Sequence, residues 1–236
     1  MNHDRPPGTR EWVYESIVRS VPGVNTSRRV ALAVQFLGFE LAVLLLGWYH
    51  GLPRAAIAGT IGVLVSVAGS VFMLRLSTNF RRETEPRQYL ELLLGSGIEL
   101  VLGLVSFILL IVYAFVYNPQ SGGPQLVTDL LGAQPPLLFS AVLLFIGWDV
   151  AYRIGVGWWA CVTGFWRTVR FGEGLPRETR RSFARLDALT IVFASLQLIV
   201  VPVLSGHLIL QAAVVGHVVA VGVVSGASVA LLRRRH

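Results

Sequence analysis

The chain has 236 residues, of which 54% are hydrophobic and only 14% are charged, and its mean hydropathy is +0.64. Because an ordinary soluble domain carries about 25% charged residues, this composition excludes a soluble globular protein and indicates a polytopic α-helical membrane protein. All 20 basic residues are arginine, and without lysine neither a retinal or pyridoxal Schiff base nor a P-loop lysine is possible. The net charge of +7 is interpreted as a topology signal and not as a nucleic-acid-binding surface.

Residues 1–29 precede the first apolar run and are predicted to form a cytoplasmic N-terminal segment. Within this segment Val13, Ile17 and Val21 recur at a regular spacing of one helical turn, and charged residues occupy the other face. This pattern is typical of an amphipathic helix that lies in the membrane interface. A short helix packed against the cytoplasmic loops would show the same pattern. The remaining residues, 30–236, are predicted to form the transmembrane domain.

Six apolar segments are long enough to cross a bilayer, whose core of about 30 Å needs about 20 apolar residues per helix. The predicted fold class is therefore all-α, a polytopic integral membrane bundle of six transmembrane helices. The spans are expected at about residues 30–50, 55–76, 90–117, 137–166, 187–205 and 207–232. The third and fourth segments are longer than one crossing requires, so they are expected to tilt or to extend beyond the bilayer.

Arginine is distributed unevenly between the two sides of the predicted bundle. All arginines except Arg54 and Arg153 lie in or beside the segments that precede the first span, join the second to the third, join the fourth to the fifth, or follow the sixth. Because basic residues favour the cytoplasmic side, both termini are predicted to be cytoplasmic in a multi-pass protein of the cell membrane. The connections on both sides are short, so no separate soluble catalytic domain is expected.

Three of the spans share a local pattern that suggests internal repetition. The strings GFELAVLL, GIELVLGL and SLQLIVVP each place a strongly polar residue (Glu40, Glu99 or Gln197) before a leucine and at the same distance from a preceding arginine. Three pseudo-repeated helical hairpins would produce this pattern, and so would the constraints that all membrane spans share. Both explanations stay open at the level of sequence.

A small set of polar residues is expected near the membrane midplane, where each ionised side chain costs roughly 2.5–3.5 kcal/mol on insertion scales. Asp149 and Arg153 are one helical turn apart, so they share a helix face and are expected to form an ion pair. Such a pair either lets a polar face enter the bundle or forms part of a conduction or substrate site. The full set is Glu40, Glu99, Asp149, Arg153, Gln197 and His217.

Glu40 and Glu99 have no cation at their expected depth apart from Arg153 and a protonated His217. Burial favours the neutral acid form of a carboxyl group, and a carboxyl that is neutral when buried and ionised when wetted is what a proton-coupled carrier needs. An excess of acid over base at the midplane also favours cations over anions. The alternative is that both glutamates are hydrogen-bonded contacts that hold neighbouring helices together.

The pattern assigns no catalytic residue and no cofactor, and an enzyme is not expected. His50 and His207 begin or end spans on the outer side and are weak candidates for haem or metal ligation, because ligation normally needs further ligands at a recognisable spacing. The single cysteine, Cys161, lies near the cytoplasmic end, away from both histidines, and the sequence has no GxSxG motif.

Gly222 and Gly226 form a GxxxG spacing in the sixth span. Small residues at this spacing let two helix backbones approach closely. The motif therefore predicts either close packing inside the bundle or a seam through which two copies form a homo-oligomer.

Two hypotheses about function follow from these features. The first is a small membrane transporter or channel for a cation or a proton-coupled solute, in which the midplane carboxylates carry the charge and the other midplane residues tune it. The second is a non-transporting membrane subunit or scaffold that binds a partner through the basic cytoplasmic loop at 167–186 and the amphipathic N-terminal segment. The expected partners are the lipid bilayer and, in the first hypothesis, a small cation or proton.

Overall fold

The computed structural model describes residues 28–79 and 87–234, and within these ranges the chain is helical, without strands. Six of its helical segments are long and apolar enough to cross a membrane, which is the number that the apolar runs predict. They are Leu32–Tyr49, Pro53–Ser77, Gln88–Gln120, Leu137–Phe171, Arg177–Val200 and Leu208–Arg234. The amphipathic helix predicted in the N-terminal segment lies outside the described residues.

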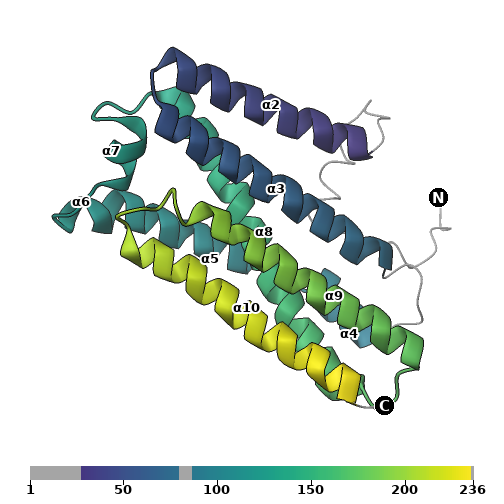
Figure 1. Ribbon diagram of the computed structural model, residues 1–236. Helices are drawn as coiled ribbons and strands as arrows, with labels where there is room; N and C mark the ends of the chain where they lie inside the picture. The colour runs from purple at the N-terminus through teal and green to yellow at the C-terminus, as the bar shows by residue number, and fades with distance from the viewer. Residues whose placement is uncertain (1–27, 80–86, 235–236) are drawn as a thin grey trace, which may run out of the picture.

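Four long helices lie side by side and a fifth crosses behind them (Figure 1). Helices α2 (Arg28–Tyr49), α3 (Pro53–Asn79), α9 (Arg177–Leu196) and α10 (Leu208–Arg234) run roughly parallel or antiparallel, and α8 (Leu137–Phe171) crosses at an angle (Figure 1). Helix α2 begins at the same end of the bundle where α10 ends. The order of the chain therefore produces three consecutive hairpins, whose paired spans pack against each other.

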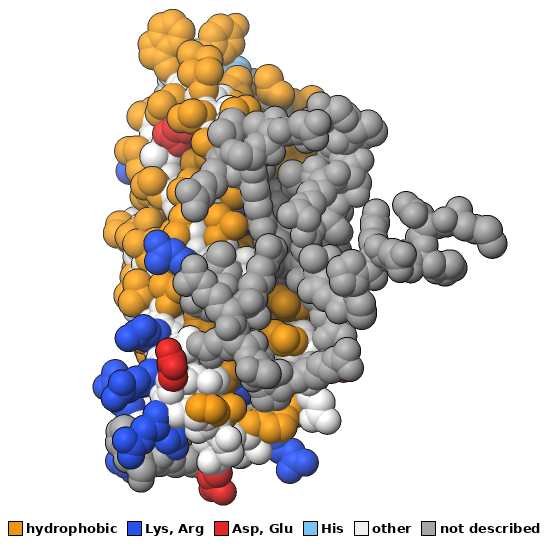
Figure 2. Space-filling model, turned by 90° about the vertical axis from the view of Figure 1, so that its right-hand side faces the viewer, with side chains coloured by type: hydrophobic (Ala, Val, Ile, Leu, Met, Phe, Trp, Pro, Cys, Tyr) orange, Lys and Arg blue, Asp and Glu red, His pale blue; other side chains and the backbone are white. Residues whose placement is uncertain are grey.

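One end of the bundle carries most of the described arginines, including those at positions 167–185 and 233–234, and is called the arginine-rich end. Figure 2 shows arginine side chains gathered there, whereas hydrophobic side chains predominate among the described residues that are visible over the rest of this face. Many apolar side chains outside the core are exposed, such as Leu37 at 70% and Val223 at 66%. Such a surface would be unfavourable in water, and it is what a lipid-facing surface consists of.

The third span is not one continuous helix. Helix α4 (Arg87–Gly95) ends at a bend formed by Ser96 and Gly97, and α5 (Ile98–Val112) begins directly after it. Gly97 has a φ of 68°, a left-handed conformation that glycine adopts more readily than any residue with a Cβ. Helix α5 then continues into one π-helical turn, η1 (Tyr113–Tyr117).

Two short helices, α6 (Asn118–Gln120) and α7 (Leu126–Leu131), cover the opposite end of the bundle. The buried side chain of Asn118 accepts a hydrogen bond from the backbone N–H of Leu126 at 2.6 Å and donates one to the carbonyl of Pro124 at 2.8 Å. These bonds satisfy backbone N–H and C=O groups of the turn between α6 and α7, which have no hydrogen-bond partner within a helix.

Helix α9 begins about three turns before the start that its apolar run predicts, and it ends in a 3₁₀ turn, η2 (Gln197–Val200). Its first turns are amphipathic: arginines occupy one face, and Phe183 and Leu186 lie on the other, where they are buried. The largest buried apolar cluster lies here, where α3, α4, α8, α9 and α10 meet, and it includes Phe72 stacked on Phe193 with ring centres 4.9 Å apart. The core is therefore thickest toward the arginine-rich end.

Candidate functional site

The ion pair predicted from the spacing of Asp149 and Arg153 in α8 is confirmed. Arg153 donates from Nε to Asp149 Oδ2 at 2.8 Å and from Nη2 to Asp149 Oδ1 at 3.0 Å. This bidentate geometry is the stronger form of an arginine–carboxylate pair. The Arg153 side chain is only 3% exposed, so the two charges neutralise each other inside the bundle.

Arg153 occupies the space where α8 meets α2 and α3. Its Nη1 lies 3.7 Å from Met73 Sδ, and its guanidinium carbon lies 5.8 Å from the centre of the Phe36 ring, a cation–π distance. The neighbouring position on α3 is Gly69, where an added Cβ would come within 2.3 Å of Arg153 Cδ. The ion pair therefore packs α8 against α2 and α3.

Glu40 lies between the two helices of the first hairpin. Its Oε1 accepts a hydrogen bond from Thr60 Oγ1 of α3 at 2.8 Å, whereas Oε2 is buried without a partner among the described residues. This contact between α2 and α3 is the kind of hydrogen-bonded link that the second interpretation of the glutamates expects.

Glu99 has a different environment, because it is fully buried and its carboxyl group has no hydrogen-bond partner among the described residues. It lies in the first turn of α5, immediately after the bend at Gly97. Neither carboxyl oxygen has a hydrogen-bond partner among the residues that the structure describes. A buried ionised carboxylate without a partner costs several kcal/mol, so this position is unfavourable for a charge.

The backbone around Glu99 packs directly against α8. At Gly103 an added Cβ would come within 2.8 Å of Tyr152 Cα, and at Gly155 an added Cβ would come within 2.7 Å of the Glu99 carbonyl oxygen. Positions 153 and 155 are about 200° apart around an α-helix. The Arg153 ion pair and the contact with α5 therefore lie on different faces of α8.

Gln197 and His217 complete the predicted midplane set. Gln197 is buried at the start of η2, and neither atom of its amide group has a partner among the described residues. His217 lies on α10 with its ring centre 5.9 Å from that of Trp158, and its Nε2 is likewise unpaired in the described part of the chain. Within that part, the hydrogen bonds and ion pairs join only Asp149 and Arg153 among the six predicted residues.

A second buried ion pair, which sequence reasoning missed, lies toward the arginine-rich end. Arg167 Nη2 of α8 donates to Asp187 Oδ2 of α9 at 2.8 Å, and Ser228 Oγ of α10 donates to the same oxygen at 2.6 Å. Arg167 Nη1 lies 3.3 Å from the hydroxyl of Tyr89 on α4, and its guanidinium carbon lies 3.9 Å from the centre of the Phe183 ring. The pair therefore connects four helices.

The apolar runs place Arg167 in a cytoplasmic connection and Asp187 at the first position of the fifth span. In the structure α8 continues beyond Arg167 and α9 begins well before Asp187, so both charges lie inside helices. The spacing of Phe183, Leu186 and Thr190 was the available signal, because it continues a buried helical face past the polar residues around it.

The two histidines that were weak candidates for metal ligation, His50 and His207, lie in different surroundings. His207 is buried, with Nε2 3.6 Å from Asp129 Oδ2 and Nδ1 3.3 Å from the Tyr113 hydroxyl. His50 is exposed beside the Tyr49 ring. In the described ranges, no group of three or more histidine, cysteine, aspartate or glutamate side chains has the arrangement needed to hold a metal ion.

Gly222 and Gly226 do not pack against another helix of the described bundle. A Cβ added at either position would meet no atom within 4 Å. Close packing inside the bundle, one of the two interpretations of this motif, is therefore wrong, and the surface of α10 at these glycines is open to lipid or to another chain.

Six helices that are long and apolar enough to cross a membrane, with many exposed apolar side chains around them, suggest a multi-pass helical membrane protein. The chain belongs to DUF7530, a family of unknown function, which matches residues 8–228. The match covers most of the N-terminal segment and nearly all of the six-helix bundle. No curated protein and no solved structure shows a significant match to the chain.

Proposed function

We propose that the protein is a small transporter or channel of the cell membrane that handles a cation or a proton-coupled solute, with Glu99 as the group that takes up and releases the proton. The observation that carries this proposal is the buried carboxyl of Glu99, whose two oxygens have no partner among the described residues. An ionisable residue inside a membrane span is costly, and such residues commonly mark ion or proton pathways.

The broken helix at Gly97 supports the proposal. Membrane carriers often build their ion sites from discontinuous helices, where the ends of half-helices meet the bound charge. Glu99 lies in the first turn of α5, so the positive end of the helix dipole is beside its carboxyl group. This position would stabilise the ionised form whenever water reaches the site, while dryness favours the neutral acid.

The other midplane residues have supporting roles in this proposal. The Asp149–Arg153 pair and the bond between Glu40 and Thr60 keep neighbouring helices in register, and Gln197 and His217 tune the polarity of the path. From the positive-inside rule we further propose that the arginine-rich end faces the cytoplasm and that both termini are cytoplasmic. We interpret the three consecutive hairpins as pseudo-repeats.

The test of the proposal is proton flux in liposomes that contain the purified protein and an internal pH-sensitive dye, driven by an imposed membrane potential. Wild-type protein is expected to raise proton entry above that of empty liposomes, and Glu99→Gln is expected to return it to that background, because an amide cannot release a proton. Glu178→Gln makes the same chemical change at an exposed position of α9 and is the matched control. Flux through Glu99→Gln equal to wild type would remove Glu99 from the mechanism.

A second candidate is the non-transporting membrane subunit or scaffold. The observation that favours it is that three buried charged residues, Arg153, Arg167 and Asp187, are all held in ion pairs, Arg153 with the half-buried Asp149 and Arg167 with Asp187. In this case wild-type liposomes would pass neither protons nor alkali cations, whereas the protein would be recovered from its native membrane with a stable partner.

A homo-oligomer through Gly222 and Gly226 is a further proposal about assembly. Because a Cβ at either glycine meets no atom of the described residues within 4 Å, Gly222→Leu is expected to leave the fold of one copy intact while it separates two copies packed at this seam. Chemical cross-linking of the protein in native membranes measures the effect. Unchanged dimer yield in the variant would argue against this seam.

A further inference from the structure

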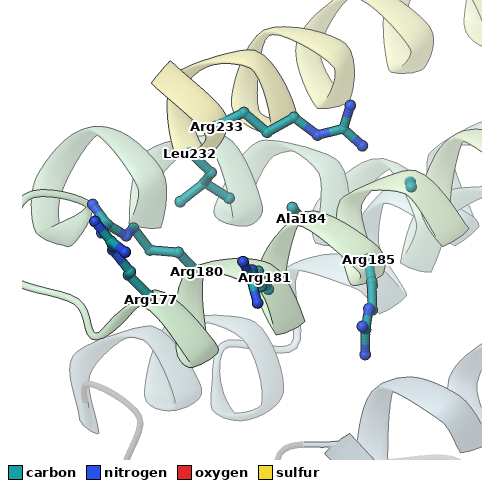
Figure 3. Close-up of a pocket in the computed structure, with 8 residues that line it drawn as sticks. Arg177, Arg180, Arg181, Ala184, Arg185, Leu232 and Arg233 are labelled. Carbon is teal, nitrogen blue, oxygen red and sulfur yellow. The ribbon is translucent and has the colours of Figure 1, made fainter. Parts of the chain in front are cut away.

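The arginine-rich end contains a groove of about 370 Å³ between the start of α9 and the end of α10. Five of its lining residues are arginines, four from α9 and one from α10: Arg177, Arg180, Arg181, Arg185 and Arg233. Figure 3 shows these side chains along the two facing helices, and the described residues that line the groove include no acidic one. We propose that this groove binds the phosphate-bearing headgroup of an anionic phospholipid from the adjacent leaflet.

Arg181, Arg185 and Arg233 give the groove a positive charge that favours an anionic ligand. Several guanidinium groups that line one small space repel one another, and basic groups beside a helix N-terminus are also opposed by the helix dipole, which is positive at that end. Arg177 is the first residue of α9 and Arg181 follows one turn later. A bound phosphate would compensate both effects, because helix N-termini and arginine forks are favourable binding partners for phosphate.

The apolar part of the groove distinguishes a lipid from a free anion. Ala184, Ala188 and Leu232 also line it, and Leu232 points from α10 toward α9 (Figure 3). Along α9, positions 181, 184, 188 and 192 follow the spacing of a single helix face. This face changes from arginine to alanine to Val192, which is 63% exposed. A headgroup at the arginines would therefore place its acyl chains along an apolar surface that continues into the membrane-spanning part of the helices.

The location agrees with this occupant. Basic pockets between transmembrane helices at the membrane surface are common sites for anionic headgroups. The groove lies where α9 and α10 leave their apolar segments, so a headgroup bound there stays at the level of its neighbours in the leaflet. Neither Glu99 nor the Asp149–Arg153 pair lines the groove, so the inference is independent of the proposed transport function.

The experiment measures binding of phosphatidylglycerol to the full chain in detergent micelles by native mass spectrometry, beside zwitterionic phosphatidylcholine and inorganic phosphate. Phosphatidylglycerol is expected to remain bound under conditions that strip phosphatidylcholine. The double variant Arg181→Gln/Arg185→Gln is expected to lower its affinity about 30-fold, since each basic residue near an anionic lipid surface contributes about 1 kcal/mol.

The matched control is Arg170→Gln/Arg234→Gln, which removes the same charge from exposed arginines near the same end that do not line the groove. It is expected to retain wild-type affinity within about twofold, because neither arginine lines the groove and no contact with the headgroup is lost. All four substituted arginines are exposed, and thermal unfolding without added lipid confirms that both variants are folded. Equal losses in the two double variants, no preference for phosphatidylglycerol, or full displacement by inorganic phosphate would each overturn the proposal.

Discussion

Replacing Asp187 with alanine is expected to destabilise the protein by about 3–5 kcal/mol, because it breaks a buried, hydrogen-bonded ion pair by removing one partner. Arg167 is fully buried, and Asp187 Oδ2 accepts its hydrogen bond at 2.8 Å together with one from Ser228. The same change also removes a contact that joins α8, α9 and α10. Thermal or denaturant unfolding of the purified protein in detergent measures the loss.

Two further variants test whether the loss of stability in Asp187→Ala comes from the buried ion pair and not from a general effect of mutation. Glu178→Ala removes an exposed carboxylate from the same helix and is expected to change stability by less than about 0.5 kcal/mol. The double variant Arg167→Met/Asp187→Leu removes both charges, and it is expected to be more stable than Asp187→Ala alone, since buried pairs are often replaced by apolar residues at little cost. If Asp187→Ala is as mild as Glu178→Ala, the pair does not hold the helices together.

Hydropathy and residue spacing were sufficient to predict the features of the bundle that depend on single helices. Each of the six apolar segments is long enough by itself to cross a bilayer, so the number of spans can be counted from the apolar runs in the sequence. The Asp149–Arg153 pair is also local, because the two residues share one helix face whatever their neighbours are.

Contacts between helices were not predictable in this way. Arg167 and Asp187 meet only because α8 and α9 are adjacent, and hydropathy does not determine which helices are neighbours. The bend at Gly97 is a local feature that was available, since Gly95, Ser96 and Gly97 interrupt an apolar run with residues that favour turns. What makes Glu99 a candidate site, a buried carboxyl without a partner, depends on the packing of α5 against α8 and so required the fold.

Gly155→Ala is expected to destabilise the contact between α5 and α8 by about 1–3 kcal/mol, the usual cost of overpacking a close contact. The added Cβ would lie 2.6 Å from the backbone nitrogen of Gly103 and 2.7 Å from the carbonyl oxygen of Glu99. Both are backbone atoms, so no side chain can rotate away and α5 itself must move. Gly103→Ala is expected to act in the same direction, because its Cβ would come within 2.8 Å of Tyr152 Cα.

Gly216→Ala is the matched control for this contact, and it is expected to stabilise the protein instead of destabilising it. A Cβ at Gly216 meets nothing within 4 Å, and alanine is favoured over glycine inside a helix by roughly 0.5–1 kcal/mol.

Because the contact at Gly155 holds the backbone of Glu99, its displacement should also admit water to the carboxyl group, and liposomes with Gly155→Ala should leak protons faster than wild type. Faster leakage that disappears in Gly155→Ala/Glu99→Gln would connect the packing of α5 to the proposed chemistry of Glu99, whereas leakage that persists in the double variant would trace it to a loosened bundle alone.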